Sequence, residues 1–189
     1  DVGDDGICIK SGKDADGRNR GVACENVIVD GCTVFKGHGG FVVGSEMSGG
    51  VKNVMVTNCQ FLGTDVGLRF KSARGRGGVV ENIYIKDMSM FDIQTDVVTF
   101  DLYYGGKSAV EVLNDGDQKK QQVVDMKKVD VTTPAFRNID INHVICRGAR
   151  RAAYFNGLPE MPVQNISIKD MEAVSYTHLR AHETGAYLV

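Results

Sequence analysis

An asparagine followed by alternating aliphatic residues recurs five times along this chain, at nearly constant spacing. The sequence numbers of successive asparagines differ by 27, 29, 56 and 27. Repeats of this length are typical of a solenoid, in which each copy buries its apolar face against its neighbours. The long third interval equals two periods, so we expect one turn of the repeat to lack the phrase. The copies are Asn26-Val27-x-Val29, Asn53-Val54-x-Val56, Asn82-Ile83-x-Ile85, Asn138-Ile139-x-Ile141 and Asn165-Ile166-x-Ile168.

Each repeat is predicted to be a strand, a bend and a second strand. The first and third positions after the asparagine are Val or Ile, β-branched residues that place one face of a strand inward. The sixth and eighth positions are again mostly apolar, and a further strand is needed to fill the rest of the repeat. The fifth position carries residue types that mostly accept left-handed backbone, which predicts a fixed bend. Its occupants are Gly31, Asn58, Asp87, His143 and Asp170.

This pattern predicts an all-β fold, a right-handed single-stranded parallel β-helix (a solenoid) that is truncated at the N-terminus. A leucine-rich horseshoe is disfavoured because its Leu-x-x-Leu-x-Leu signature is missing. The five cysteines cannot all pair internally. Cys32 and Cys59 occupy the slot that Met88 fills in a later repeat, so they are interpreted as small buried hydrophobes.

Three segments are distinguished. Residues 1–174 are predicted to form a β-helix domain fragment, in which residues 13–21 form a loop that shapes one end of a cleft. Residues 106–133 are polar and interrupt the pattern, so we expect a loop or hairpin insertion there, on the face that binds ligand. Residues 175–189 lack the alternation, resemble a non-native translated tail and are left out of the functional argument.

Charge gives little information about partners for the chain as a whole. A net charge of −2 is no nucleic-acid signal, and no apolar run is long enough to span a membrane. We therefore expect no nucleic acid or membrane as a partner, and a monomer. Basic residues nevertheless crowd the first half, either as a solvated face or as a site for an anionic chain. They are Lys10, Lys13, Arg18, Arg20, Lys36, Arg69, Lys71, Arg74 and Arg76.

Three short polar motifs recur about one repeat apart: Gly3-Asp4-Asp5-Gly6, Gly37-His38-Gly39-Gly40 and Arg69-Phe70-Lys71. Each alone has a simple structural explanation, as a turn, a tight bend or a solvent face. Stacked repeats would bring all three to one groove, and strand alternation places both cations of the third motif on the outer face. Because an acid pair, a histidine and a cation pair would then meet, the combination favours a functional site.

These motifs, in this order and spacing, resemble glycoside hydrolase family 28, the polygalacturonases, over residues 1–174. The Gly-His-Gly segment with the trailing Val43-Gly44-Ser45 is its most specific part. The resemblance implies a right-handed parallel β-helix that cleaves α-1,4-galacturonosidic bonds of pectin or polygalacturonate by inverting hydrolysis. It implies no cofactor and no metal. It also implies an anionic polysaccharide or oligogalacturonide as substrate, and a secreted or periplasmic location.

By the same resemblance, Asp4 corresponds to the general acid and Asp5 to a carboxylate that activates water. His38 corresponds to the residue that supports the protonation state of the acid and lines the cleft. Inverting glycosidases hold the two carboxyl groups about 6.5–9.5 Å apart to leave room for water. A neighbouring carboxylate raises the pKa of the acid, which must stay protonated.

The resemblance also makes Arg69 and Lys71 the cations that bind the galacturonate carboxylate, since an arginine can hold a carboxylate through two parallel hydrogen bonds. The family uses a tyrosine about one repeat later. Strand alternation favours Tyr103 for the outer face, whereas spacing favours Tyr104, which we select.

The family has a third carboxylate, in an Asn-Thr-Asp motif one repeat before the acid pair, and this sequence begins after that point. We expect the chain as given to be weakly active or inactive; equal turnover by an N-terminally extended version would refute this. Two alternatives remain. A pectate lyase-like enzyme would use Ca²⁺, with Asp4, Asp5 and Arg69 recast for β-elimination. A non-catalytic β-helix would bind polysaccharide without cleaving it.

Overall fold

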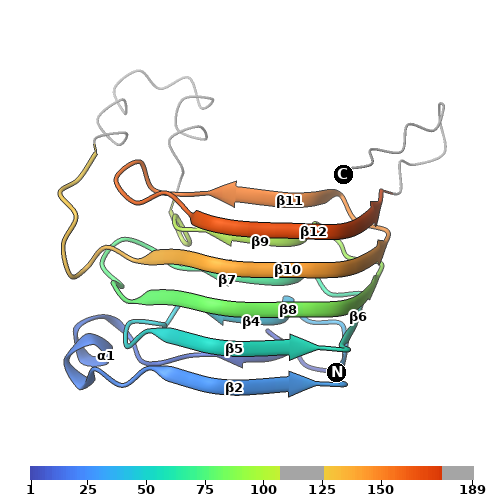
Figure 1. The fold of residues 1–189 in the computed structure, drawn as a ribbon, viewed down its shortest axis with the longest axis horizontal. Helices are drawn as coiled ribbons and strands as arrows, with labels where there is room; N and C mark the ends of the chain where they lie inside the picture. The colour runs from blue at the N-terminus through green and yellow to red at the C-terminus, as the bar shows by residue number, and fades with distance from the viewer. Residues whose placement is uncertain (107–125, 176–189) are drawn as a thin grey trace.

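The computed structural model describes residues 1–106 and 126–175, which wind into a coil of stacked parallel strands (Figure 1). All pairings between its named strands are parallel, so the predicted parallel β-helix is confirmed. The short helix α1 (Asp14–Arg20) is the exception to the all-β description. Within these described residues, no helix has the length and apolar character needed to cross a membrane.

Each turn of the coil contributes strands to separate faces, as the strand–bend–strand phrase with a further strand predicts. One face is the β1–β11 sheet, with β1 (Ile7–Ile9), β4 (Gly39–Gly44), β7 (Val66–Lys71), β9 (Asp96–Asp101) and β11 (Arg151–Asn156) in that order. The opposite face is the β2–β12 sheet, with β2 (Cys24–Asp30), β5 (Val51–Thr57), β8 (Val79–Phe91), β10 (Ala135–Arg147) and β12 (Gln164–Val174). Beside it, β3 (Thr33–Phe35) pairs with β6 (Gln60–Leu62), and β6 pairs with the second half of β8.

The doubled interval between Asn82 and Asn138 is a single turn of the coil. Strand β8 pairs directly with β10, and Ile83 lies opposite Ile139. The prediction that one turn lacks the repeat phrase is therefore wrong, because β8 and β10 are direct neighbours with no turn of the coil between them. Of the predicted insertion at 106–133, residues 107–125 lie outside the described residues, as do residues 176–189 of the predicted tail. Both assignments stay predictions.

The repeated asparagines form a hydrogen-bonded ladder along the coil. All five have left-handed backbone, with φ between 50° and 58°. The side-chain amide of Asn53 donates to the side-chain oxygen of Asn26 over 3.2 Å, and Asn165 donates to Asn138 over 2.8 Å. Asn82 continues the ladder between them, donating to Asn53 over 3.3 Å. The short polar side chain of asparagine tolerates this backbone better than most residues do.

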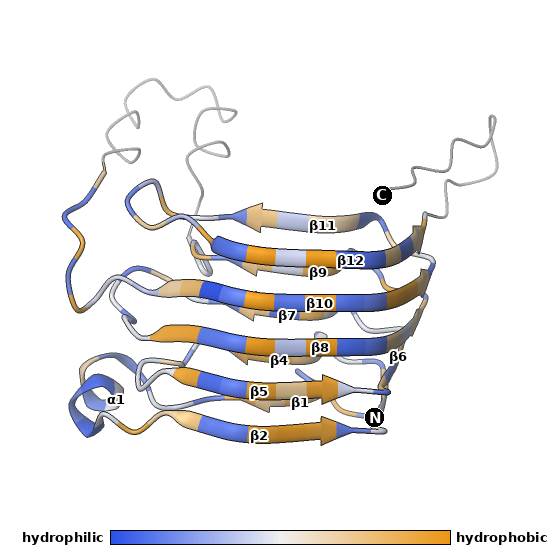
Figure 2. Cartoon of the chain, in the orientation of Figure 1, coloured by the Kyte–Doolittle hydropathy of each residue, from blue (hydrophilic) through white to orange (hydrophobic). Residues whose placement is uncertain are grey.

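The bends predicted at the fifth position after each asparagine are present. Gly31, Asn58, Asp87, His143 and Asp170 all have positive φ, between 51° and 65°. The Val and Ile positions point inward: Val54, Val56, Ile83 and Ile85 are buried. Figure 2 shows this alternation as orange and blue bands along β5, β8 and β10.

Aromatic rings stack through the core behind the β1–β11 sheet. The ring centroids of Phe70 and Phe100, both fully buried, are 4.6 Å apart, and the rings are nearly parallel. Phe155 continues the stack at 5.2 Å from Phe100 but is half-exposed at its end. Burying an aromatic or aliphatic side chain of this kind contributes about 1.5–3 kcal/mol. Cys59 is buried and Cys32 is half-buried, in agreement with their predicted place in the core, and all five cysteines are free. The coil is thus a firm support for residues on its outer face.

Most of the stretch predicted as a loop at 13–21 is the helix α1, which ends at Gly21 with φ 62°. The helix is tied to the segment that follows β7. Arg18 donates to the carbonyl oxygens of Gly75 and Arg76 over 2.6 and 2.8 Å. Arg76 in turn binds the carboxylate of Asp14 at 2.7 Å. A polar helix of seven residues carries too little apolar periodicity to be recognised from sequence.

Candidate active site

The three polar motifs lie on the outer face of the β1–β11 sheet, on successive turns of the coil. Strand register places Cys8 of β1 opposite Val42 of β4, which lies opposite Arg69 of β7. Before these strands, the backbone N–H of His38 donates to the carbonyl of Asp4 over 3.0 Å. Residues about one repeat apart in the sequence are therefore neighbours here.

Asp5 is held by a buried ion pair. The Nζ atom of Lys71 lies 2.6 Å from Oδ2 of Asp5, and the two side chains are 7% and 6% exposed. Arg69 is more open, with Nη1 at 3.7 Å from Oδ1 of Asp5. Gly39 permits this crowding, because a Cβ atom there would lie 2.4 Å from a methyl group of Val42 and 3.4 Å from Oδ1 of Asp5.

Lys71 was expected to bind the substrate carboxylate, yet its ammonium group is engaged with Asp5 and is hardly exposed. Alternation within β7 is as predicted, since Leu68 and Phe70 are fully buried while Arg69 points outward. Arg69 is therefore the more exposed of the two cations on this strand. Its side chain is 24% exposed.

The two adjacent tyrosines have different environments. Strand β9 ends at Asp101, so strand alternation no longer applies at Tyr103. Tyr103 is only 8% exposed, whereas Tyr104 is 38% exposed. The Tyr104 ring lies 4.9 Å from Nζ of Lys71 and 5.6 Å from Cζ of Arg69. Of the two, Tyr104 faces the cation pair, the position that spacing favours.

The imidazole of His38 is paired with Asp65, a residue that the sequence argument missed. Nδ1 of His38 lies 2.6 Å from Oδ2 of Asp65. This hydrogen bond, together with the negative charge of Asp65, raises the pKa of His38; the charges of Asp4 and Asp5 act in the same direction. Asp65 follows His38 by one repeat interval, so the spacing held a signal for it.

The paired aspartates themselves have contrasting surroundings. Asp4 is exposed, and its Oδ1 accepts the backbone N–H of Asp5 over 2.8 Å. The Asp5 side chain is buried, and its Oδ1 has no hydrogen-bond donor among the described residues. One carboxyl group that meets solvent beside another held by a cation is an arrangement that can divide acid and base roles.

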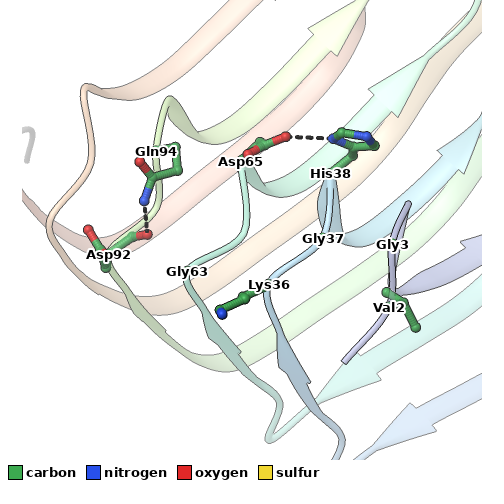
Figure 3. Close-up of a pocket in the computed structure, with 9 residues that line it drawn as sticks. All are labelled: Val2, Gly3, Lys36, Gly37, His38, Gly63, Asp65, Asp92 and Gln94. Atoms are coloured by element: carbon green, nitrogen blue, oxygen red, sulfur yellow. Dashed lines mark hydrogen bonds and ion pairs between the residues drawn. The ribbon is translucent and has the colours of Figure 1, made fainter.

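A pocket of about 360 Å³ opens beside His38, at the corner where the coil enters the β1–β11 sheet (Figure 3). It is lined by Val2, Gly3, Lys36, Gly37, His38, Gly63, Asp65, Asp92 and Gln94. Over residues 1–106 and 126–175, no group of three or more His, Cys, Asp and Glu side chains is arranged to hold a metal ion.

Comparison with known proteins places these residues in a family context. The model of "Glycosyl hydrolases family 28" matches residues 1–153. A "Probable polygalacturonase" of Vitis vinifera is 25% identical over 170 residues, covering 89% of this chain and 31% of that protein. An "Exo-poly-alpha-D-galacturonosidase" of Dickeya chrysanthemi is 31% identical over 104 residues, covering 55% of this chain and 17% of the other.

A solved structure has the same fold. The chain superposes on a hyperthermoactive exopolygalacturonase from Thermotoga maritima with a TM-score of 0.74 and 32% sequence identity, over 90% of this chain and 34% of that one. The chain thus spans about a third of the length of the Vitis vinifera protein and of this solved structure.

Proposed function

The chain belongs to glycosyl hydrolases family 28, and from this membership we propose that it hydrolyses α-1,4-galacturonosidic bonds of pectin or polygalacturonate by inverting acid–base catalysis. The observation that carries the proposal is the contrast between Asp4 and Asp5: one carboxyl is exposed, and the other is buried against Lys71 at 2.6 Å. Inverting hydrolysis needs such a division between an acid and a base.

Asp4 is assigned as the general acid. Its exposed carboxyl can reach the glycosidic oxygen of a sugar chain that lies across the β1–β11 sheet. His38, whose backbone joins that of Asp4, lines the same edge and keeps its imidazole oriented through Asp65. A positioned acid of this kind contributes about 10²–10⁴-fold to the rate.

Asp5 is assigned to activating the attacking water. Lys71 compensates its buried negative charge and fixes its orientation, so we assign Lys71 to Asp5 in place of direct substrate binding. Arg69 is assigned to the galacturonate carboxylate, because its guanidinium is partly exposed and can make two parallel hydrogen bonds. The Tyr104 ring beside both cations would form a wall of the same sugar site.

The proposed reaction also indicates the type of substrate. Polygalacturonate carries a negative charge on each sugar, so we propose an anionic polysaccharide or oligogalacturonide as substrate, and a monomeric enzyme that needs no nucleic acid. Since pectin lies outside cells, we propose a secreted or periplasmic location.

The test is release of new reducing ends from polygalacturonate by the chain and by an N-terminally extended version, with and without a chelator. Asp4→Asn should abolish release, whereas Asp16→Asn, in an exposed pair on α1, should not. An unsaturated, ultraviolet-absorbing product that a chelator suppresses would instead indicate a lyase. Polysaccharide binding without any cleavage by either version would indicate a non-catalytic β-helix.

A further inference from the structure

We propose that the pocket beside His38 is a second sugar subsite, which takes one uronate residue of an oligogalacturonide through the ammonium group of Lys36. The inference rests on the proposed function. It adds a residue, Lys36, that would favour a negatively charged sugar at a position away from the bond that is cleaved. The pocket is drawn in Figure 3, with His38 and Asp65 on one side and Asp92 on another.

The pocket is built from three successive corners of the coil. Lys36, Gly63 and Asp92 occupy the same slot on neighbouring turns, each with left-handed backbone, at φ 54°, 71° and 56°. The N–H of Lys36 donates to the carbonyl of Leu62, and that of Gly63 to the carbonyl of Phe91, over 2.8 and 2.9 Å. The slot is therefore as firmly positioned as the strands that flank it.

Gly63 leaves a gap between the two charged side chains. Neighbouring turns are about 4.8 Å apart, so the backbones of Lys36 and Asp92 are about 10 Å apart. Gly63 between them has no side chain, and Cγ of Lys36 lies 3.9 Å from where a Cβ of Gly63 would be, so the lysine side chain lies over the glycine. The resulting volume of about 360 Å³ is at the small end of the range of ligand pockets, about 300–1,000 Å³. It suits a single sugar residue.

The polar groups around the gap match a uronate. Lys36 is exposed, and among residues 1–106 and 126–175 it has no side-chain hydrogen bond or ion pair, so its charge is available to a ligand. At the other end, Gln94 lies beside Asp92 and donates to its backbone carbonyl over 3.1 Å. A uronate would place its carboxylate on Lys36 and its hydroxyl groups on Asp92 and Gln94. A phosphate dianion would instead meet the carboxylates of Asp92 and Asp65.

The location links the pocket to the cleavage centre. His38 lines the pocket and also adjoins Asp4 through its backbone. A sugar held by Lys36 would therefore belong to the same chain as the bond that lies over Asp4 and Asp5. Lys36 would strengthen the binding of longer charged oligomers without taking part in the chemistry.

The experiment compares Lys36→Met with Lys169→Met, a matched loss of an exposed lysine on β12 in the opposite sheet. Affinity for trigalacturonate and for its methyl ester is measured by titration calorimetry. Lys36→Met should weaken binding of the acid about tenfold or more, as for loss of a charged hydrogen bond, and leave the ester unaffected. Lys169→Met should change neither affinity. Lys36→Gln gives a second variant if the Met variant is poorly folded.

Three outcomes would overturn the inference. Equal binding of trigalacturonate by the wild type and both Lys36 variants would remove the subsite while leaving the proposed function intact. An equal loss of affinity for trigalacturonate and for its methyl ester would show that Lys36 shapes the pocket and does not interact with the carboxylate. Failure of the wild type to bind any galacturonate oligomer would overturn the proposed function and the subsite together.

Discussion

The ammonium group of Lys71 lies 2.6 Å from the carboxylate of Asp5, and each of the two side chains is more than nine-tenths buried. The residues are far apart in the sequence and meet because β1, β4 and β7 stack in register. Removing two charges from water costs several kcal/mol per ion, which only close pairing offsets. The proposed base therefore depends on a cation two turns of the coil away.

Replacing Lys71 with Met should lower the free energy of unfolding by about 3–5 kcal/mol, because Asp5 would remain buried without its partner. Hydrolysis should be lost with it. Lys52→Met is the control, since Lys52 pairs with Glu25 on the surface and such pairs contribute below about 1 kcal/mol. Urea unfolding and reducing-end assays measure the two effects. Similar losses for the two variants would contradict the buried pairing.

Asp65→Asn should lower the pKa of His38 towards that of free histidine, since the hydrogen bond to Asp65 and then its charge raise it. A pKa raised in the folded state contributes stability that is fully present below the unfolded value, about 6.5. That contribution is lost as the pH rises through the folded value. The wild type should therefore exceed the variant in stability near pH 6 and match it at high pH.

Nuclear magnetic resonance titration of the imidazole ring gives the pKa of His38, and urea unfolding at several pH values gives the stability difference. Asp16→Asn, remote on α1, should leave the pKa of His38 unchanged. A pKa that does not move in the Asp65 variant would show that the 2.6 Å contact is absent in solution.

Glu160→Gln should raise KM more than it lowers kcat. The side chain of Glu160 is 2% exposed, and its carboxylate accepts two hydrogen bonds of 2.6 and 2.8 Å from Arg74. Arg74 lies 5.3 Å above the ring of Tyr103, the residue before Tyr104. Without these hydrogen bonds between Arg74 and Glu160, Tyr104 should be held less firmly beside Arg69, the cation that we propose binds the substrate.

The same substitution should lower the free energy of unfolding by about 1–3 kcal/mol, because the group left without its partner is Arg74, whose side chain is 21% exposed. Glu81→Gln is the comparison, because Glu81 pairs with Arg137 on the surface. Steady-state kinetics on galacturonate oligomers separate KM from kcat. Equal changes in both parameters would argue against a positioning role for Glu160.

Asn82→Ala should destabilise the coil by about 1 kcal/mol more than Asn82→Gly, since alanine resists left-handed backbone and glycine accepts it. Asn82 has φ 57° and connects its neighbours in the ladder by hydrogen bonds of 3.3 and 3.5 Å. Both variants lose those hydrogen bonds, so their difference isolates the backbone. Urea midpoints in the reverse order would refute the strain argument.

Much of the fold could be predicted because every turn of the coil needs apolar residues at the same inward positions and a left-handed residue at the same bend. The Val and Ile slots are buried in the three middle repeats and half-buried in the first and last, and the bends at Gly31 and Asn58 are left-handed. Spacing misled at the doubled interval, because distance along the chain does not reveal whether a segment makes a turn of the coil or leaves it. The helix α1 was not predicted because its seven residues include no large apolar side chain.

The site was predictable to the extent that strand alternation applies. It placed Arg69 outward, but it also favoured Tyr103 for the outer face. Tyr103 is only 8% exposed, because β9 ends at Asp101 and alternation does not extend to this residue. It also could not reveal that Lys71 is occupied by Asp5, since burial depends on what neighbouring turns contribute. Asp65 lay one repeat after His38 and could have been found from that interval.

Strand β8 pairs directly with β10 although the chain between them is about twice as long as between other neighbouring strands of this sheet. The position of a strand in the sheet therefore does not depend on the length of the segment before it. Strands of successive turns are joined by backbone hydrogen bonds, whatever the length of the segment that connects them. Long excursions at one corner can therefore change in length and composition while the platform beneath keeps its dimensions. In such an architecture, the loops around the proposed active site can evolve without displacing the side chains that the sheet holds in place.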